Sequence, residues 1–430
     1  MYDVIIIGGG LGYVAAIVLS KTGKKVALIE KNLDHIGGTC LHNGCIPSKN
    51  LLHRAKTLIE SKEEVFEGNL KLNLAKLQEK IKKIIQKNTK AILNQLKIAG
   101  VDIIEGEGFI TDEGVKIDGK TLKSTYTIIA TGSTPRIPQG IEYDKKRVIT
   151  SDEALNFKEI PQEISIYGSG AIGLEMASFF AAAGSSVNLI YRHERISNKF
   201  PKTITQNIET QLKNIGVNLI PNTQINEAKT INDWVVCKTD KNEFKTPFLL
   251  VAAGREPNIS AVKTDKIKVN KAIVTDEYFQ TTMPGVFAVG DCNGKLLLAH
   301  AARAQALNVA SNILGKKEKL ILENIPKFIY TLPLSYASIG VRSENLGEFP
   351  LSNLGISGSL YGDKLGIVRL YFDNENFLCG GDILAPNAEE LIGILSSAVA
   401  GESDINILKN AVFPHPTYSE AIDRAIRRVK

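Results

Sequence analysis

Two cysteines separated by four residues carry the clearest chemistry in this sequence of 430 residues. Cys40 and Cys45 lie in the run GGTCLHNGCIPSK, residues 37–49. Such a segment brings two Cα atoms to the roughly 5.5 Å of a disulfide only if it bends sharply, and Gly44 permits the bend. A small loop removes little entropy from the unfolded chain, which argues against a structural disulfide. The pair alone fits a redox couple, two unpaired core cysteines or half of a zinc site, although no second Cys/His pair at zinc spacing occurs.

The residues after the second cysteine predict a helix. Apolar residues recur with helical spacing over 48–59, directly after Ile46-Pro47. A helix that begins here places a thiol at or near a helix N-terminus. The helix dipole lowers the pKa of a thiol in that position and favours the reactive thiolate.

Two segments far apart in the sequence repeat one plan of strand, glycine-rich turn, helix and strand. The first consists of a strand over 3–7, a turn with Gly8, Gly10 and Gly12, a helix over 13–22 and a strand over 25–29. The second consists of a strand over 163–167, a turn with Gly168, Gly170, Ile172 and Gly173, a helix that ends at Ala183 and a strand over 186–190. Glycines between strand and helix let backbone amides approach a pyrophosphate. The repeat predicts an α/β fold with two Rossmann-like dinucleotide-binding domains.

The residue after the second strand of each unit indicates which nucleotide binds. In the first unit this residue is Glu30, whose carboxylate accepts hydrogen bonds from an adenosine ribose and repels a 2′-phosphate, so FAD or NAD is expected. The second unit has no acid there and offers Arg192, His193 and Arg195. Guanidinium groups clamp phosphate oxygens, which favours NADP. The alternative is an ordinary charged loop in which Glu194 pairs with a neighbour, with NAD as the nucleotide.

Later strands complete both units, and the pattern then changes. The expected elements are strands from Tyr126, Leu249 and Val286, a helix from about His300 to Leu314, strands over 366–371 and 378–384, and helices over 388–400 and 417–428. The first three strands end at Thr131-Gly132, Gly254 and Gly290-Asp291. The last four elements predict an α+β domain at the end of the chain.

Composition narrows the class of protein. Five cysteines do not make a secreted disulfide framework, so a reducing compartment is expected, with Cys237, Cys292 and Cys379 as packing residues. The sequence shows no basic leader and no apolar run of membrane-spanning length, so we expect a cytoplasmic protein with no membrane partner. The net charge is +6, and the lysine-rich amphipathic helix predicted over 71–97 lacks interleaved aromatic residues. No nucleic-acid partner is expected.

The cysteine run and a motif near the C-terminus resemble one family. The run over 37–49 is close to the active-site motif of dihydrolipoamide dehydrogenases, and FPHPTYSE over 413–420 resembles that family's C-terminal signature His-Pro-Thr-x-Ser-Glu. From end to end the chain resembles the FAD-dependent pyridine nucleotide-disulfide oxidoreductases, which also include glutathione reductase and mercuric reductase. The resemblance implies an enzyme that transfers two electrons between NAD(P)(H) and a dithiol or disulfide substrate through FAD and the cysteine pair.

The resemblance also implies roles for four residues near the flavin. Cys45 is the thiol nearest the flavin, and Cys40 is the thiol that exchanges with substrate. Lys49 lies beside the flavin ring and pairs with Glu175 of the second unit. A fixed cation there favours the reduced flavin and the neighbouring thiolate.

A histidine and a glutamate near the C-terminus are the implied base and orienter. His415 accepts and returns the protons of thiol exchange, and Glu420 orients it. Taken locally, Thr417 and Glu420 also fit a capping box after a helix-starting Pro416. In this family the histidine reaches the disulfide of the other subunit, so the resemblance implies a homodimer with shared active sites.

The complete set of expected cofactor contacts follows from the motifs and the resemblance. Those to FAD are Gly8, Gly10, Gly12, Glu30, Thr39, Lys49, Thr131, Gly132, Asp291 and Ala299. Those to NADP or NAD are Gly168, Gly170, Ile172, Gly173, Arg192, His193, Arg195 and Gly254. No metal site is predicted. The expected domains are 1–140 (FAD-binding, first part), 141–257 (NAD(P)-binding), 258–320 (return to the FAD and central domain) and 321–430 (dimerisation).

Two departures from the family pattern leave alternatives open. The first glycine-rich turn is one residue short, so that Tyr13 falls where a third glycine is expected, and Gly10-x-Gly12-x-x-Ala15 offers an alternative frame. The cysteine motif resembles dihydrolipoamide dehydrogenase, with a lipoyl group as substrate, whereas the basic residues after the second unit resemble glutathione reductase. The leading hypothesis is an enzyme of the dihydrolipoamide dehydrogenase type. The alternatives are an NADPH-dependent reductase of glutathione or another small disulfide, and a non-catalytic flavin-binding accessory protein.

Overall fold

The computed structural model describes residues 1–356 and 364–429, which form two compact units. The first unit contains residues 1–48, 76–136 and 254–322, and the second contains residues 49–75, 137–253 and 323–430. Within the described residues, no helix combines the length and the apolar character needed to cross a membrane.

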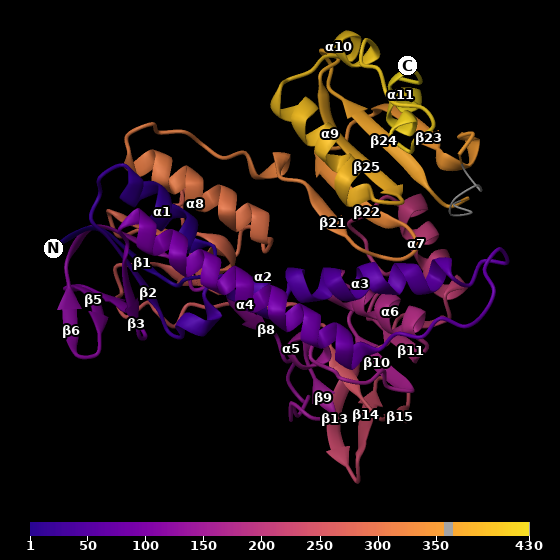
Figure 1. Ribbon diagram of the computed structural model, residues 1–430, viewed down its shortest axis with the longest axis horizontal. Helices are drawn as coiled ribbons and strands as arrows, with labels where there is room; N and C mark the ends of the chain where they lie inside the picture. Colours follow the sequence, from indigo (N-terminus) through magenta and orange to yellow (C-terminus); the bar gives the residue numbers. More distant parts are fainter. Residues whose placement is uncertain (357–363, 430) are drawn as a thin grey trace. The chain divides into compact units, whose positions relative to one another are not determined.

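A parallel five-stranded sheet forms the centre of the first unit (Figure 1). Its strands, in order, are β20 (Val286–Ala288), β7 (Ser124–Ile129), β1 (Tyr2–Ile7), β2 (Val26–Glu30) and β3 (Asp102–Glu105). Val4 and Ile6 of β1 pack with the helices α1 (Gly12–Lys21) and α8 (Ala299–Ile313). Ile5 and Ile7 face the opposite side of the sheet. Burial on both faces explains why β1 reads as a continuous apolar run.

Smaller elements complete the first unit. An antiparallel sheet of β4 (Phe109–Thr111), β5 (Gly114–Ile117) and β6 (Lys120–Leu122) supplies the core opposite the helices. A two-stranded sheet pairs β8 (Ser133–Pro135) with β17 (Arg255–Pro257). The lysine-rich helix expected over 71–97 is α4 (Leu74–Ala99), which packs its apolar side through Leu96 and Ile92.

The second unit contains another parallel five-stranded sheet (Figure 1). Its strands, in order, are β12 (Val217–Ile220), β11 (Ser186–Ile190), β10 (Glu163–Tyr167), β16 (Leu249–Val251) and β9 (Val148–Ile149). The helices α6 (Ala171–Ala183) and α7 (Lys202–Asn214) contact this sheet. An antiparallel sheet of β13 (Ile225–Ile231), β14 (Trp234–Thr239) and β15 (Glu243–Thr246) adjoins it.

The final part of the chain is an antiparallel sheet covered by helices. The strands, in order, are β21 (Lys327–Ile329), β22 (Ser335–Gly340), β25 (Leu378–Ala385), β24 (Ile367–Phe372) and β23 (Asn345–Pro350). Helix α9 (Ala388–Ala400) packs on β22 and β25, and α11 (Glu420–Ile426) packs on β23 and β24 (Figure 1). Together these elements bury one apolar core.

The predicted fold class is confirmed, and two of the differences in helix boundaries fall at candidate site residues. The helix expected over 48–59 is α3 (Cys45–Glu60), which begins three residues earlier. The helix expected over 417–428 is α11 (Glu420–Ile426), because Thr417 and Ser419 bond to each other and stay outside the helix. The predicted division into four domains stays a prediction.

The two glycine-rich turns use the same close backbone contact. Gly8 and Gly168 both have left-handed φ, at +105° and +119°. A Cβ at Gly8 would lie 2.4 Å from the carbonyl oxygen of Ala130, and one at Gly168 would lie 2.3 Å from that of Ala252. Each turn therefore closes tightly onto the end of the strand that returns beside it, which requires glycine.

We predict that Gly173→Ala destabilises the second unit. A Cβ at Gly173 would lie 1.8 Å from the carbonyl oxygen of Gly168, so α6 would have to move away from the turn. We expect the free energy of unfolding, measured by urea denaturation, to fall by about 2 kcal/mol or more. The control is Gly170→Ala, because a Cβ at Gly170 meets no atom within 4 Å. Equal stability of the two variants would contradict the proposed packing role of Gly173.

Candidate active site

The two candidate redox thiols lie on consecutive helices joined by Asn43 and Gly44. Cys40 is in α2 (Gly38–His42), and Cys45 is the first residue of α3. A Cβ at Gly44 would lie 2.7 Å from the Thr39 carbonyl oxygen and 3.2 Å from the Cys40 Cα. The sharp bend expected at Gly44 is present, and the missing side chain is what permits it. Cys45 is exposed and Cys40 is half-buried.

The early start of α3 puts Cys45 itself at the helix N-terminus. Its first turn includes Pro47, whose missing N–H costs nothing because first-turn amides have no partner within the helix. The Ser48 amide donates to the Gly44 carbonyl at 3.0 Å. Cys45 therefore lies at the positive end of the helix dipole.

The thiol segment is bonded directly to the first glycine-rich turn. The Gly37 amide donates to the Gly9 carbonyl at 2.9 Å. A Cβ at Gly38 would lie 2.8 Å from the Cα of Gly10, so the two backbones touch. Gly37 and Gly38 both have left-handed φ. These contacts hold the start of α2, and with it Cys40, against the turn that is expected to bind FAD.

The glycines of the first turn have separate functions. A Cβ at Gly12 would lie 2.9 Å from the Ala130 Cβ, so Gly12 allows α1 to pack closely on the end of β7. At the corresponding place in the second unit, a Cβ at Gly173 would lie 3.6 Å from the Ala252 Cβ. Tyr13 occupies the position of the expected third glycine. Gly12, one residue earlier, therefore permits the close helix packing that this third glycine would allow.

The open side of each turn fits a dinucleotide. A Cβ at Gly10 would meet no atom closer than 3.9 Å, and one at Gly170 would meet none within 4 Å. The absence of a side chain at these positions leaves the backbone accessible to a pyrophosphate. Glu30 closes the other side of the first turn, where its Oε2 accepts from the Gly9 amide at 2.6 Å.

A polar network holds Asp291, one of the expected FAD contacts. The Ser133 hydroxyl donates to Asp291 Oδ2 at 2.5 Å, and Arg255 Nε donates to that hydroxyl at 2.7 Å. Arg255 Nη2 also donates to the Ser133 carbonyl at 2.7 Å. Sequence analysis did not assign Ser133 or Arg255 to the site. Both directly follow glycines at strand ends, which is the signal that could have identified them.

The other expected FAD and nucleotide contacts lie at element ends. Thr39 is in α2, Thr131 and Gly132 lie between β7 and β8, Ala299 begins α8, Gly254 precedes β17, and Ile172 is in the first turn of α6. The Thr131 hydroxyl donates to the Asn258 carbonyl at 2.6 Å.

Burial raises the pKa of Cys237 to about 12 and that of Cys292 to about 11, so neither thiol is a nucleophile near neutral pH.

The basic residues of the second unit belong to a loop after β11, which we call the basic loop (residues 191–201). Tyr191 is buried, and Arg192 is the first residue of the loop with an exposed side chain. Among the residues that the structure describes, no ion pair joins Glu194 to Arg192, His193 or Arg195. Glu194 therefore does not form an ion pair with the described basic side chains of its own loop.

The basic loop is tied to the glycine-rich turn of its own unit. The Ser169 hydroxyl, between Gly168 and Gly170, donates to the Ile196 carbonyl at 2.7 Å. The Ile196 amide donates to Glu209 in α7 at 2.9 Å. The role of Ser169 could not be predicted from the sequence, because a hydrogen bond between residues so far apart in the chain leaves no periodic pattern.

Lys49 and Glu175 form the ion pair expected from the resemblance. Lys49 Nζ lies 2.7 Å from both carboxylate oxygens of Glu175, and Glu175 Oε1 also accepts from the Tyr330 amide at 3.0 Å. Glu175 is only 7% exposed. Lys49 Nζ also lies 5.4 Å from the centre of the Phe328 ring, a cation–π distance. A buried carboxylate thus holds a lysine ammonium in place.

His415 and Glu420 are also in contact. His415 Nδ1 lies 3.0 Å from Glu420 Oε1, and Glu420 Oε2 accepts from the Thr417 amide at 3.1 Å. The hydrogen bond from His415, followed by that from Thr417, lowers the pKa of Glu420, so these contacts persist until the pH falls through that lowered value. Only half of the expected capping box forms, because the Thr417 hydroxyl donates to the Pro414 carbonyl.

The geometry defines how the histidine can act. An ionised carboxylate only accepts hydrogen bonds, so Nδ1 of His415 donates to Glu420. This leaves Nε2 available to take a proton from a thiol. The His415 side chain is 75% exposed in the single chain, whereas that of Glu420 is 17% exposed. Glu420 therefore holds the His415 ring in a fixed orientation while that ring remains exposed.

Comparisons with known proteins cover nearly the whole chain. The family described as pyridine nucleotide-disulphide oxidoreductase matches residues 2–306, and the dimerisation domain of that family matches residues 325–426. The chain is 34% identical to dihydrolipoyl dehydrogenase of Chlorobaculum tepidum over 453 residues, covering 99% of this chain and 96% of the relative. It is 32% identical to a dihydrolipoyl dehydrogenase of Bacillus subtilis over 463 residues, covering 99% and 97%.

Solved structures share the fold at lower identity. LpdA from Mycobacterium tuberculosis superposes with a TM-score of 0.91 at 23% identity, covering 100% of this chain and 99% of that one. The HOCl-induced flavoprotein disulfide reductase RclA from Escherichia coli, solved as a Cu(II) complex, superposes with a TM-score of 0.89 at 24% identity, also covering 100% and 99%.

We predict that removal of the lysine partner of Glu175 lowers the free energy of unfolding more than removal of both charges does. Lys49→Met leaves a buried carboxylate without its cation, and we expect the free energy of unfolding to fall by about 2 kcal/mol. Adding Glu175→Gln removes the unpaired charge and keeps an acceptor for the Tyr330 amide, so stability should partly recover. Urea denaturation of the single and double variants measures this, and a double variant less stable than Lys49→Met would contradict it.

Proposed function

Since the chain belongs to the pyridine nucleotide-disulphide oxidoreductase family, we propose that it acts as a dihydrolipoyl dehydrogenase with NADP as its nucleotide. The family assignment makes it an FAD-dependent enzyme that exchanges electrons between a pyridine nucleotide and a disulfide. The lipoyl substrate is supported by the relatives named dihydrolipoyl dehydrogenase, which match this chain over almost its full length.

One observation carries the proposal: the thiol segment is joined to the first glycine-rich turn. Gly37 bonds to Gly9, and Gly38 touches Gly10, so α2 starts at the turn. A dinucleotide held at Gly10 and Glu30 lies beside the segment that leads to Cys40. This arrangement suits electron transfer between a flavin and a dithiol.

The residues present fit FAD, with the open backbone at Gly10, the carboxylate at Glu30 and the braced Asp291 as its expected contacts. Bound FAD supplies two-electron transfer between the nicotinamide and the cysteine pair. Lys49, held by Glu175, provides a fixed cation that favours negative charge developing near it.

Thiol exchange then follows from the cysteines and the histidine. His415 removes a proton from one thiol of the dihydrolipoyl group, and the resulting thiolate attacks Cys40. A bond forms between the two sulfurs, the Cys40–Cys45 bond breaks, and Cys45 leaves as a thiolate at the start of α3. The second substrate thiol attacks the first substrate sulfur and passes its proton to Cys40, which leaves as a thiol, while His415 keeps the first proton. The substrate becomes a disulfide, and the cysteine pair gains the two electrons.

The exposure of His415 supports its action on a second copy of the chain. Its ring is 75% exposed although Glu420 holds it in a fixed orientation. An oriented but uncovered base fits a site that is completed by a partner subunit. The match of residues 325–426 to the family's dimerisation domain agrees with this proposal.

The choice of NADP rests on the basic loop, which also favours a second candidate function. Arg192 and His193 are exposed, and Arg195 is half-buried, beside the tethered turn at Ser169. Guanidinium groups suit a 2′-phosphate. An NADPH-dependent reductase of glutathione or another small disulfide would use the same loop, and the preferred disulfide in a direct assay distinguishes the two functions.

We predict that His415→Gln slows thiol exchange and leaves the nicotinamide reaction intact. Loss of a general base should slow flavin reduction by dihydrolipoamide by a factor of about 10² or more. Stopped-flow absorbance measures this half-reaction, and it measures flavin reduction by NADPH separately. The matched control is His53→Gln, an exposed histidine of α3. If both half-reactions of His415→Gln slow equally, the base assignment is wrong.

We predict that Arg192→Ala weakens NADPH binding selectively. Loss of one charge-assisted hydrogen bond should raise KM for NADPH about tenfold and leave KM for NADH unchanged. Steady-state kinetics with lipoamide and each nucleotide measures the ratio. Lys202→Ala removes an exposed positive charge just beyond the loop and serves as the control. Wild-type enzyme that uses NADH as well as NADPH would refute the NADP assignment.

A further inference from the structure

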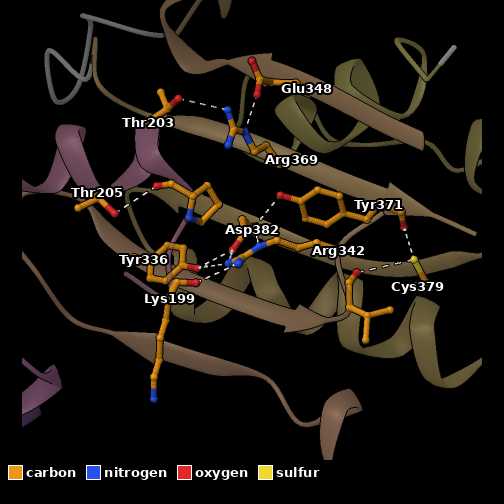
Figure 2. Close-up of polar contacts among 12 residues, drawn as sticks. Lys199, Thr203, Thr205, Tyr336, Arg342, Glu348, Arg369, Tyr371, Cys379 and Asp382 are labelled. Carbon is orange, nitrogen blue, oxygen red and sulfur yellow. Dashed lines mark hydrogen bonds and ion pairs between the residues drawn. The ribbon is translucent and has the colours of Figure 1, made fainter. Parts of the chain in front are cut away.

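An arginine of the final sheet holds the end of the basic loop. Arg342 lies between β22 and β23, and its Nη1 donates to the Lys199 carbonyl at 2.9 Å (Figure 2). Figure 2 shows the Lys199 carbonyl facing the guanidinium, while the Lys199 side chain extends away from the cluster. The contact therefore acts on the loop backbone and leaves the lysine charge free to face elsewhere.

A buried carboxylate fixes this arginine. Asp382 in β25 is 1% exposed, and it accepts from Arg342 Nε at 2.9 Å and from Arg342 Nη2 at 3.1 Å. The hydroxyls of Tyr336 and Tyr371 donate to the same carboxylate at 2.5 Å and 2.8 Å (Figure 2). Burial, reinforced by the charge of Asp382, raises the pKa of both tyrosines, so both remain donors. A bidentate arginine bound in this way has little rotational freedom.

The two ends of the basic loop are held by different parts of the second unit. Ser169 and Glu209 fix Ile196, as described above. Beyond Ile196, the Lys199 amide bonds only locally, to the Ser197 hydroxyl at 3.1 Å. The Ser197 carbonyl accepts from the Thr205 hydroxyl of α7 at 3.4 Å. The final sheet adds two further contacts, in which Arg342 holds the Lys199 carbonyl and the Tyr336 ring packs on Phe200 with centres 4.6 Å apart. The side chains from Arg192 to Arg195 precede these fixed points, and within this stretch the His193 carbonyl accepts from the Asn222 amide at 3.1 Å.

We propose that Arg342 is a positioning residue for the pyridine nucleotide, acting through the Lys199 carbonyl on the basic loop. A loop that is ordered before binding loses less conformational entropy when it closes on a ligand, and this raises affinity. The inference deepens the proposed function and rests on it, because it assumes that the basic loop binds the adenosine end of the nucleotide. Arg342 itself touches neither substrate nor reacting atoms.

The test compares Arg342→Lys and Arg342→Gln in the full-length, FAD-loaded enzyme. Lysine keeps a positive charge beside Asp382 but cannot bond both carboxylate oxygens and the Lys199 carbonyl. We expect KM for the preferred nucleotide to rise about tenfold in both variants, equivalent to about 1.4 kcal/mol, with kcat at saturation unchanged. The rate of flavin reduction by dihydrolipoamide without nucleotide should also be unchanged. A purely structural role would lower FAD content or melting temperature and both half-reactions together.

The matched control is Arg369→Lys. Arg369 lies in β24 of the same sheet, pairs with Glu348, and reaches only the Thr203 hydroxyl of α7, at 3.4 Å (Figure 2). Its KM for nucleotide should match that of the wild-type enzyme. A rise in KM confined to the Arg342 variants supports the proposal. An unchanged KM in both Arg342 variants, or an equal rise in Arg369→Lys, overturns it.

Arg192→Ala separates this proposal from the proposed function. If Arg192→Ala leaves the preference between NADPH and NADH unchanged, the NADP assignment fails, and the Arg342 result is then judged on whichever nucleotide the wild-type enzyme prefers. If Arg192→Ala shifts the preference while the Arg342 variants do not change KM, the proposed function stands and the positioning role of Arg342 is wrong.

Discussion

The contact between two glycine-rich backbones is the constraint on which the candidate site depends. Gly38 lies so close to Gly10 that a Cβ at Gly38 would be 2.8 Å from the Gly10 Cα, and the Gly37 amide bonds to Gly9. Neither segment can shift without the other. Gly44 then sets the separation of α2 and α3 by the same means, so the position of both thiols follows from missing side chains. In this region, close contacts between backbone segments determine where the two thiols lie, without any contribution from polar side chains.

Elements with a local pattern could be predicted from the sequence, and contacts between distant segments could not. The strands β10 and β11 and the helix α9 have the expected bounds, because apolar periodicity and flanking glycines mark them. The early start of α3 was missed because proline is tolerated in a first turn. The bracing of Asp291 by Ser133 and Arg255 was missed for another reason. Each of these residues follows a different strand, and only the folded sheet brings the strand ends together.

Two buried carboxylates of the second unit hold cations in different ways. Glu175 binds the single ammonium of Lys49, which can rotate and still keep its contact. Asp382 binds two nitrogens on one edge of a planar guanidinium, which leaves the third nitrogen of Arg342 aimed at one carbonyl. The lysine ammonium acts as a point charge, which suits a site where electrostatic stabilisation is needed. The planar arginine guanidinium donates hydrogen bonds in fixed directions, which suits a site where a backbone group must be positioned. The choice of lysine or arginine therefore matches the function proposed for each pair.

The divided sequence of the first unit has a consequence for synthesis on the ribosome. β20 pairs with β7 only after residues 137–253, which belong to the other unit, have been made. Until then the edge of β7 and the apolar surface of α1 that α8 will cover have no permanent partner. Pairing across such a long stretch of chain is slow, and exposed strand edges attract other chains. The nascent protein therefore passes through a stage at which its first nucleotide site is incomplete and the edge of β7 is unpaired by β20.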